Sequence, residues 1–181
     1  PLTHTNNGWL NMSGVEWVGL PAVTGYTNFT VEAWAMATDW DDNNHHDIVD
    51  GWASGSNIDW FRIGILNTGK VCFRVDSGDD DAGLVDAEFS HSLVDNTWHH
   101  IVGVCDMDAN LIYLYLDSVE VDTTAYTDST AIDPPNLAIG SRGPGDGEFW
   151  DGSIDEVKIY KRALSPAEIT KNYKHGLSKH S

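Results

Sequence analysis

Four segments of this chain carry enough oxygen-bearing side chains to bind a cation. They are residues 39–44, residues 54–57 together with Asp59, residues 79–81 and residues 140–148. Calcium in proteins is bound by several carboxylate, amide and carbonyl oxygens from flexible loops, and each segment offers two or more such groups. None has the spacing of an EF-hand loop. Two interpretations remain open: a cation site built from these loops, or solvated turn residues without a ligand.

Asp155 is a candidate metal ligand for a different reason. Polar and apolar residues alternate here, which predicts a strand over 152–161 with Asp155 on the same face as Val157 and Ile159. An ionised carboxylate that faces the core must be satisfied by backbone amides, a cation or a metal ion. The same alternation places the carboxylate of Glu156 on the opposite face, so we do not expect the two groups to act on one bond.

Aromatic side chains form a second candidate surface. In the strand expected over 58–66 the odd-numbered apolar residues point inward, which turns Trp60 and Arg62 outward. By the same count Tyr113 and Tyr115 point outward from their strand. The C–H patches of a sugar ring pack on aromatic faces, and nearby carboxylates and amides bind its hydroxyl groups. These residues therefore predict a carbohydrate-binding face.

Three more tryptophans lie in or beside loops and are candidates for stacking on a sugar: Trp40, Trp52 and Trp150. Four others fall in expected strands or at their edges and are expected in the core: Trp9, Trp17, Trp34 and Trp98. The strand expected over 47–52 separates the loop at 39–46 from the loop at 53–57. These two loops therefore lie at opposite edges of the sheet and do not form one site.

The turn at 67–69 predicts an unusual pair of cations. A three-residue loop with Gly69 in a left-handed conformation places Arg62 directly opposite Arg74. Like charges so placed repel each other unless an anionic group lies between them. Because the chain has 28 acidic residues, a protein carboxylate such as Asp76 is the favoured partner. The alternative is a bound acidic ligand, which would be a uronate or a sulfated sugar.

The segment after the last expected strand predicts one short helix. Ser165 is a suitable N-cap, a proline follows at the first helical position, and Glu168 stands at the third. Leu164, Ile169 and Tyr173 recur at spacings of five and four, which gives the helix one apolar side. We therefore expect a helix that docks on the sheet formed by the preceding strand.

Short strands separated by turn residues account for the rest of the chain. They are expected at 8–11, 15–20, 28–37, 47–52, 58–66, 70–77, 83–90, 98–105, 110–117, 119–123, 136–140 and 152–161. Many short strands at a spacing of about ten residues favour two packed antiparallel sheets. The predicted fold is therefore an all-β sandwich with one short C-terminal helix.

Several motifs agree with one family. Asn-Phe-Thr-Val-Glu-Ala-Trp at 28–34, Trp-His-His-Ile-Val-Gly-Val at 98–104 with the strand at 111–117, and the strand-to-helix run at 149–173 occur in order along the chain. They resemble the laminin-G-like domains of the concanavalin A-like superfamily, to which pentraxins are related. The resemblance implies a jelly-roll domain over residues 1–176, a tail or linker at 177–181, and a secreted or extracellular protein.

The resemblance to pentraxins also implies positions for calcium. The matching positions are Asn57 with Asp59 and Asp146 with Glu148. Where pentraxins carry an acid-amide-acid run, this chain has Ser-Arg-Gly at 141–143, so their paired-calcium, phosphocholine-binding arrangement is not expected. We expect calcium as the cofactor, with one ion bound.

Catalysis is not expected from these residues. Related glycoside hydrolases that resemble laminarinases place Glu-x-Asp-x-Glu on one strand, and this chain has no such triplet. The residue set of an alginate-lyase-like enzyme is also missing. The histidine pairs at 45–46 and 99–100 are neighbours on strands and point apart, so they chelate poorly. We therefore assign no catalytic residue.

Composition excludes some partners. With 10 Lys and Arg against 28 Asp and Glu, the formal charge is −18, so binding to nucleic acid is not expected. No apolar run approaches 18 residues, so membrane insertion is not expected. The first residues do not resemble a basic leader with an apolar centre. Cys72 and Cys105 fall in expected strands, and a disulfide and two free buried thiols both remain open.

The sequence thus predicts an extracellular, non-catalytic carbohydrate-binding module that uses calcium and binds a polysaccharide or other glycan. Neighbouring domains of a larger glycan-active or adhesive protein are expected. The main alternative is a structural or protein-interaction domain of an adhesin or viral fibre that binds no sugar. The third is a glycoside hydrolase or polysaccharide lyase, which would need two carboxylates about 5 to 9 Å apart in a groove.

Overall fold

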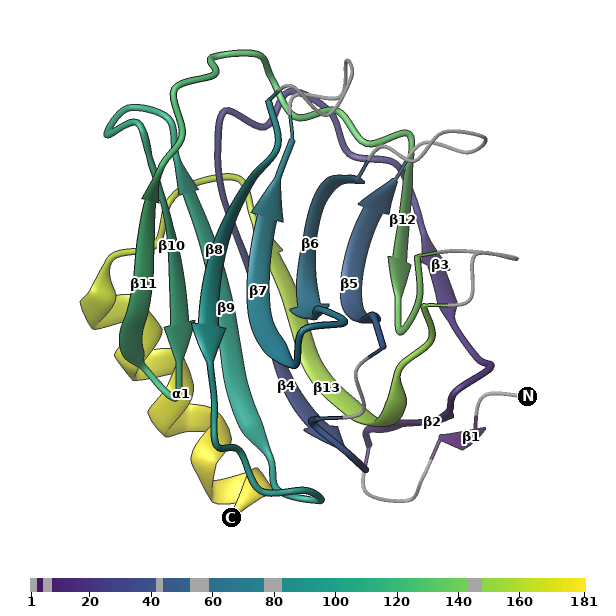
Figure 1. Ribbon diagram of the computed structural model, residues 1–181. Coiled ribbons are helices and arrows are strands. Elements are labelled where there is room, and N and C mark those ends of the chain that lie inside the picture. Colours follow the sequence, from purple (N-terminus) through teal and green to yellow (C-terminus); the bar gives the residue numbers. More distant parts are fainter. Residues whose placement is uncertain (1–2, 5–7, 42–43, 53–58, 77–82, 143–147) are drawn as a thin grey trace.

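The computed structural model shows two antiparallel sheets and one helix (Figure 1). It describes residues 3–4, 8–41, 44–52, 59–76, 83–142 and 148–181. Within these residues the elements are β1 (Thr3–His4), β2 (Leu10–Ser13), β3 (Val18–Leu20), β4 (Asn28–Ala37), β5 (His46–Trp52), β6 (Asp59–Ile65), β7 (Lys70–Val75), β8 (Val85–Ser90), β9 (His99–Asp106), β10 (Leu111–Leu116), β11 (Val119–Ala125), β12 (Asn136–Ile139), β13 (Asp151–Tyr160) and α1 (Pro166–His180). The sheet orders are β1-β2-β13-β4-β9-β10-β11 and β3-β12-β5-β6-β7-β8.

The expected all-β sandwich with one C-terminal helix is confirmed. Each expected strand corresponds to an observed one, with differences of a few residues at the ends, and β1 is additional. The helix is longer than expected, because it continues to His180 and includes most of the residues predicted as a tail at 177–181. In the described parts of the chain, no helix has the length and apolar character needed to span a membrane.

The main core lies between the two sheets. The ring of Phe29 in β4 packs against Phe61 of β6 and Phe73 of β7, with ring centroids 5.2 and 6.0 Å apart. Gly103 of β9 leaves room for Phe73, since a Cβ atom there would lie 2.1 Å from that ring. Close aromatic packing through this point therefore sets the separation of the sheets.

The two cysteines are free and buried. Cys105 belongs to the main core, whereas Cys72 of β7 lies opposite Gly64 and alternates with core residues, which places it on the outer face of the six-stranded sheet. Burial raises the pKa of both thiols to about 12. Of the two alternatives left open by the sequence, free structural thiols are correct.

The helix covers the outer face of the seven-stranded sheet (Figure 1). It begins as expected, with Ser165 and Glu168 forming a capping box. Its first half closes a second, smaller cluster of buried side chains, formed by Val102, Val104, Tyr115, Leu164 and Ile169. Burial of this apolar surface holds the helix on β9 and β10.

The second half of α1 docks through stacked rings. Tyr173 and His180 stack on Trp34 of β4, with ring centroids 5.6 and 4.6 Å apart. Gly176 faces the same ring, and a Cβ atom at this position would lie 2.2 Å from Nε1 of Trp34. Trp34 is therefore buried as expected, but under the helix rather than between the sheets.

A bulge in β13 changes the direction of Asp155. The register of β13 against β4 shifts after this residue, and Glu156 has a φ of 49°. An extra residue in a strand changes the face that the following side chains take. Val157 and Ile159 pack against the main core as expected, but Asp155 lies on the outer face beside α1. The prediction that Asp155 faces the core, with Glu156 on the opposite side, is therefore wrong.

Glu32 of β4 carries a buried charge beneath the helix. Its fully buried carboxylate accepts hydrogen bonds from Lys158 at 2.9 Å, Tyr160 at 3.1 Å and Asn172 at 2.9 Å. Burial alone would raise the pKa of Glu32, but hydrogen bonds from His100, Asn172 and Lys158 outweigh that effect and lower the pKa to about 2. One ionised carboxylate therefore joins β4, β9, β13 and α1.

The substitution Glu32→Gln should make the free energy of unfolding less dependent on pH in the acid range. Because the pKa of Glu32 is lowered from 4.5 to about 2, its contribution is present above pH 4.5 and is lost as the pH falls toward 2. We expect the variant to lose about 2–3 kcal/mol of unfolding free energy at neutral pH, and less in acid. Urea denaturation across this pH range measures the difference.

Glu88→Gln is the control for this experiment, because Glu88 forms a partly exposed ion pair with Lys70 instead of a buried one. Its difference from the wild type should stay small at each pH. A loss in Glu32→Gln that is independent of pH would contradict the assignment of an ionised, stabilising Glu32.

Candidate functional site

A polar hollow opens at the rim of the sandwich, where the connection from β4 to β5 meets the residues that lead into β13. Its volume is about 510 Å³, and its lining includes Asn44, His45, His46, Glu148, Phe149 and Asp151. A smaller hollow of about 200 Å³ shares His46 and Asp151 with it. We refer to the larger one as the rim hollow. It combines one aromatic ring with amide, imidazole and carboxylate groups, which can bind the hydroxyl groups of a ligand.

Hydrogen bonds fix the wall at 148–150. The amide of Asp47 donates to the carbonyl of Glu148 at 3.1 Å, and the amide of Trp150 donates to the carbonyl of Gly140 at 2.9 Å. Nδ1 of His46 lies 2.5 Å from the carbonyl oxygen of Phe149. The start of β5 and the end of β12 therefore hold this wall against the six-stranded sheet before the chain enters β13.

Arg62 of β6 supports the rim hollow from beneath. Its side chain is 2% exposed, with NH1 3.0 Å from Oε2 of Glu148 and 3.6 Å from Oδ1 of Asp47. Its NH2 group lies 3.2 Å from Nδ1 of His45. A buried guanidinium group requires such partners, and here they include two lining residues of the hollow. Arg62 points away from the core as expected, but its burial makes it a support rather than a surface contact.

The expected pairing of two arginines is confirmed. The tight turn with Gly69 at φ 70° forms, and Arg62 lies opposite Arg74 in the β6–β7 ladder. Arg74 makes a bidentate pair with Asp86, at 2.7 Å from Nε and 2.8 Å from NH2. Protein carboxylates therefore lie against both guanidinium groups, which is the favoured one of the two alternatives.

Trp40 and Trp150 do not offer a surface for stacking. Both are fully buried, and their rings meet edge to face with centroids 5.6 Å apart. Trp150 also lines the smaller hollow next to the rim hollow. The prediction that these rings face a ligand is wrong, because a position beside a loop does not determine the side to which the ring turns. They instead pack under the site.

Trp52 and Trp60 lie far from the rim hollow. β5 starts at the hollow with His46 and ends with Trp52, which is buried. Trp60 stands near the start of the antiparallel strand β6, and it is half-buried against the main core. These two tryptophans therefore occupy the opposite end of the six-stranded sheet and do not join the site.

Tyr113 and Tyr115 line a separate groove of about 340 Å³ beside the start of α1. Tyr115 is only 4% exposed, and its hydroxyl donates to Oε2 of Glu120 at 3.0 Å. Tyr113 is half-buried, and Asp106 also lines the groove. Both rings point outward as expected, but the helix covers one of them. The predicted aromatic face is therefore reduced to Tyr113.

The predicted metal ligands are not gathered at one place. Asn57 and Asp146 lie outside the described residues, and the side chain of Asp59, which begins β6, is not described either. Glu148 lines the rim hollow against the six-stranded sheet, whereas Asp155 lies on the outer face of the seven-stranded sheet. The sandwich separates these two carboxylates, so they cannot share one ion.

Glu148 is poorly suited to calcium. Its Oε2 atom lies 3.0 Å from the guanidinium group of Arg62, and Oε1 lies 3.9 Å from that of Arg142. Two positive charges at these distances oppose the approach of a third. The described residues around Glu148 therefore do not fit a calcium site.

Several lining residues were not predicted as part of a site. The sequence predicts that His45 and His46 chelate a metal poorly and assigns them no other role, and it predicts no ligand contact for Phe149 and Asp151. One signal was available, since the connection from β4 to β5 and the one from β12 to β13 were both recognised as oxygen-rich. What the sequence lacked was the strand order that brings these connections together.

The chain belongs to the laminin G-like family of the concanavalin A-like lectin/glucanase superfamily, because the profile of this family matches residues 12–170. No curated protein sequence matches the chain significantly. The predicted family is therefore confirmed, and the fold class with it.

Solved structures with this fold include two binding domains and a pentraxin. The binding domain of Paraclostridial Mosquitocidal Protein 1 has a TM-score of 0.69 at 17% identity, over 97% of this chain and 45% of that one. A heptameric SAP-like pentraxin from Limulus polyphemus has a TM-score of 0.67 at 11% identity, over 86% of this chain and 74% of that one. The ligand-binding domain of botulinum neurotoxin serotype D, in complex with N-acetylneuraminic acid, has a TM-score of 0.67 at 16% identity, over 88% of this chain and 39% of that one. The chain thus spans less than half of each toxin domain, and at these identities the likeness concerns the fold.

Replacing the buried arginine should destabilise the protein strongly. In Arg62→Met the carboxylates of Asp47 and Glu148 lose the guanidinium group between them, and we expect a loss of about 3–5 kcal/mol in unfolding free energy. Chemical denaturation measures this loss. The matched control is Arg162→Met, which removes an exposed pair with Glu168 and should change stability little. Equal effects of the two substitutions would show that Arg62 has no supporting role.

Proposed function

We propose that this domain is a non-catalytic glycan-binding module and that the rim hollow binds the sugar. The observation that carries the proposal is the hollow itself, in which the half-buried ring of Phe149 lies among groups that can bind hydroxyls. Because Arg62 and the hydrogen bonds of 148–150 hold these groups in place, little ordering is needed on binding.

The comparisons support this class of function. The superfamily contains lectins, and the structures with this fold include binding domains, one of them in complex with N-acetylneuraminic acid. By analogy, we propose that the chain is one domain of a larger, secreted protein that attaches to glycans. The analogy concerns the class of ligand, since the site must be argued from its own residues.

We propose a neutral glycan in preference to an acidic one. The acidic ligand was suggested by two facing arginines, but carboxylates of the protein lie against both of them. Glu148 is paired with Arg62, but the exposed carboxylate of Asp151 also lines the hollow and would repel an anionic sugar. Hydroxyl groups, by contrast, can donate hydrogen bonds to carboxylate oxygens.

Two substitutions in the hollow should weaken glycan binding without unfolding the protein. Phe149→Ala removes the ring and Asp151→Asn removes an exposed charged acceptor, so we expect each to lower affinity at least tenfold, or about 1.4 kcal/mol. A glycan array with the wild type selects the ligand, and affinity electrophoresis with that polysaccharide then compares the variants.

The controls are Tyr113→Ala in the other groove and Trp60→Ala at the opposite end of the sheet, both of which should keep full retention. Loss of retention in Tyr113→Ala alone would move the site to that groove.

No retention of any glycan would favour a structural or protein-interaction domain. Because Glu148 and Asp151 both line the hollow, release of reducing ends is also measured, and cleavage would replace our proposal with a hydrolase or lyase.

Calcium remains a prediction from the sequence, and we propose that any such site uses residues of the oxygen-rich segments other than Glu148. A cation that binds only the folded form raises the melting temperature by mass action. We therefore expect melting in excess calcium to occur at a higher temperature than melting in EGTA, with magnesium as the control cation. Identical melts in calcium and EGTA would remove calcium from the proposal.

A further inference from the structure

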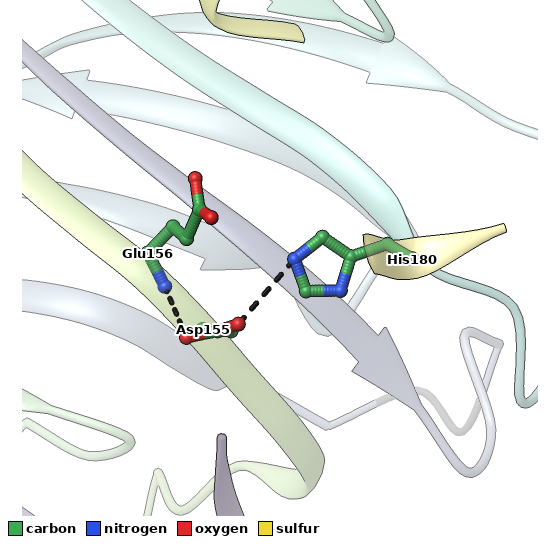
Figure 2. Close-up of side chains that lie close together, drawn as sticks. All are labelled: Asp155, Glu156 and His180. Atoms are coloured by element: carbon green, nitrogen blue, oxygen red, sulfur yellow. Dashed lines mark hydrogen bonds and ion pairs between the residues drawn. The ribbon is translucent and has the colours of Figure 1, made fainter. Parts of the chain in front are cut away.

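The end of α1 brings a buried histidine against two carboxylates of β13. The side chain of His180 has no exposed surface, and its Nε2 lies 3.4 Å from Oδ2 of Asp155 (Figure 2). Within the described part of the chain, neither ring nitrogen of His180 makes a hydrogen bond. Buried polar groups in proteins almost always have such a partner, so this imidazole indicates a missing ligand.

The bulge in β13 supplies the second carboxylate. It places Glu156 beside Asp155, and Figure 2 shows both residues on the strand that His180 faces. One ligand atom from each of the three residues lies within 4.8 Å of the other two. Ligands at about 2.0–2.2 Å from one Zn²⁺ ion are up to about 4 Å apart, so a small side-chain rotation is sufficient to complete a site.

The imidazole is in the form that binds metals. Burial lowers the pKa of His180, and the opposing effects of Asp155 and Glu156 do not overcome it, so the ring is neutral at neutral pH. A neutral imidazole has a free lone pair on one nitrogen. With two carboxylates beside it, this lone pair faces a strongly negative environment that favours a cation.

Two lysines already neutralise part of this charge. Lys179 Nζ lies 2.5 Å from Oε1 of Glu156, and Lys158 Nζ lies 3.4 Å from Oε2. Lys158 is closer to Glu32, at 2.9 Å, whereas Lys179 is 57% exposed and can turn into solvent. Lys179 is therefore a removable counter-ion that a metal ion can displace.

We propose that Asp155, Glu156 and His180 bind a divalent transition-metal ion such as Zn²⁺, which fastens the end of α1 to β13. Imidazole nitrogen and carboxylate oxygen are both ligand types of Zn²⁺, and a water molecule can complete a tetrahedral coordination around three protein ligands. Calcium does not fit, because it prefers about six to eight oxygen ligands. The site lies on the opposite outer face from the rim hollow and does not depend on the proposed function.

Titration of the full chain, without a histidine tag, with ZnCl₂ in a calorimeter tests the proposal. We expect one Zn²⁺ ion per chain, and the visible absorption of bound Co²⁺ should report an imidazole ligand. At a free Zn²⁺ concentration about 100-fold above Kd, melting should shift upward by on the order of 5–10 °C. Absence of binding at millimolar Zn²⁺ would overturn the proposal.

Substitutions identify the ligands. His180→Ala and Asp155→Asn should each weaken Zn²⁺ binding by at least ~10-fold. His175→Ala is the matched control, because it removes an exposed histidine of the same helix and should bind as the wild type does. Asp155→Asn keeps the shape of its side chain, so its result stands even if His180→Ala disturbs the helix. Equal binding by these variants and the control would overturn the proposed site.

Lys179→Ala distinguishes a metal site from a cluster with only a structural role, because only a metal site should gain affinity for Zn²⁺ in this variant. It removes the counter-ion that competes for Glu156, so we expect Zn²⁺ to bind several-fold more tightly than to the wild type. Lys174→Ala, on the exposed side of the same helix, is the control. Unchanged or weaker binding in Lys179→Ala would remove Glu156 from the ligands and overturn the three-residue site.

Discussion

A charge that is removed from water must be neutralised by its neighbours, and each sheet of this protein carries such a charge on its outer face. On the seven-stranded sheet the carboxylate of Glu32 is held by Lys158 of β13 and Asn172 of α1. On the six-stranded sheet the guanidinium group of Arg62 is held by Glu148, which precedes β13. The apolar core brings the sheets together, but these two polar contacts determine where the helix and the rim hollow lie.

The two outer faces are consequently different surfaces. The helix covers one face and buries Trp34 there, so little of that sheet is left for a large ligand. On the other face, protein carboxylates neutralise Arg62 and Arg74, and a hollow opens at its rim beside the buried rings of Trp40 and Trp150. The close packing of these aromatic rings below a polar hollow makes that end of the sandwich rigid.

Much of the fold could be predicted from the sequence, because alternation, turn residues and the Ser165 cap are local signals. The candidate site was harder to predict from the sequence. Alternation gave the correct outward direction for Arg62 but not its burial, which depends on partners such as Glu148 that are distant in the sequence. It failed at Asp155, because a bulge is a single extra residue with no compositional mark. The cluster of Asp155, Glu156 and His180 also depends on the end of the helix, which the sequence predicts as a tail.

The buried cysteines have a consequence for following the motions of this molecule. Cys105 lies between the sheets and Cys72 on the outer side of β7, and with no cross-link the covalent structure is the same under reducing and oxidising conditions. Burial suppresses thiolate formation at both, so an alkylating reagent should react only with molecules that have opened around a thiol. The two labelling rates would therefore time separately the exposure of the interior and of the outer sheet face.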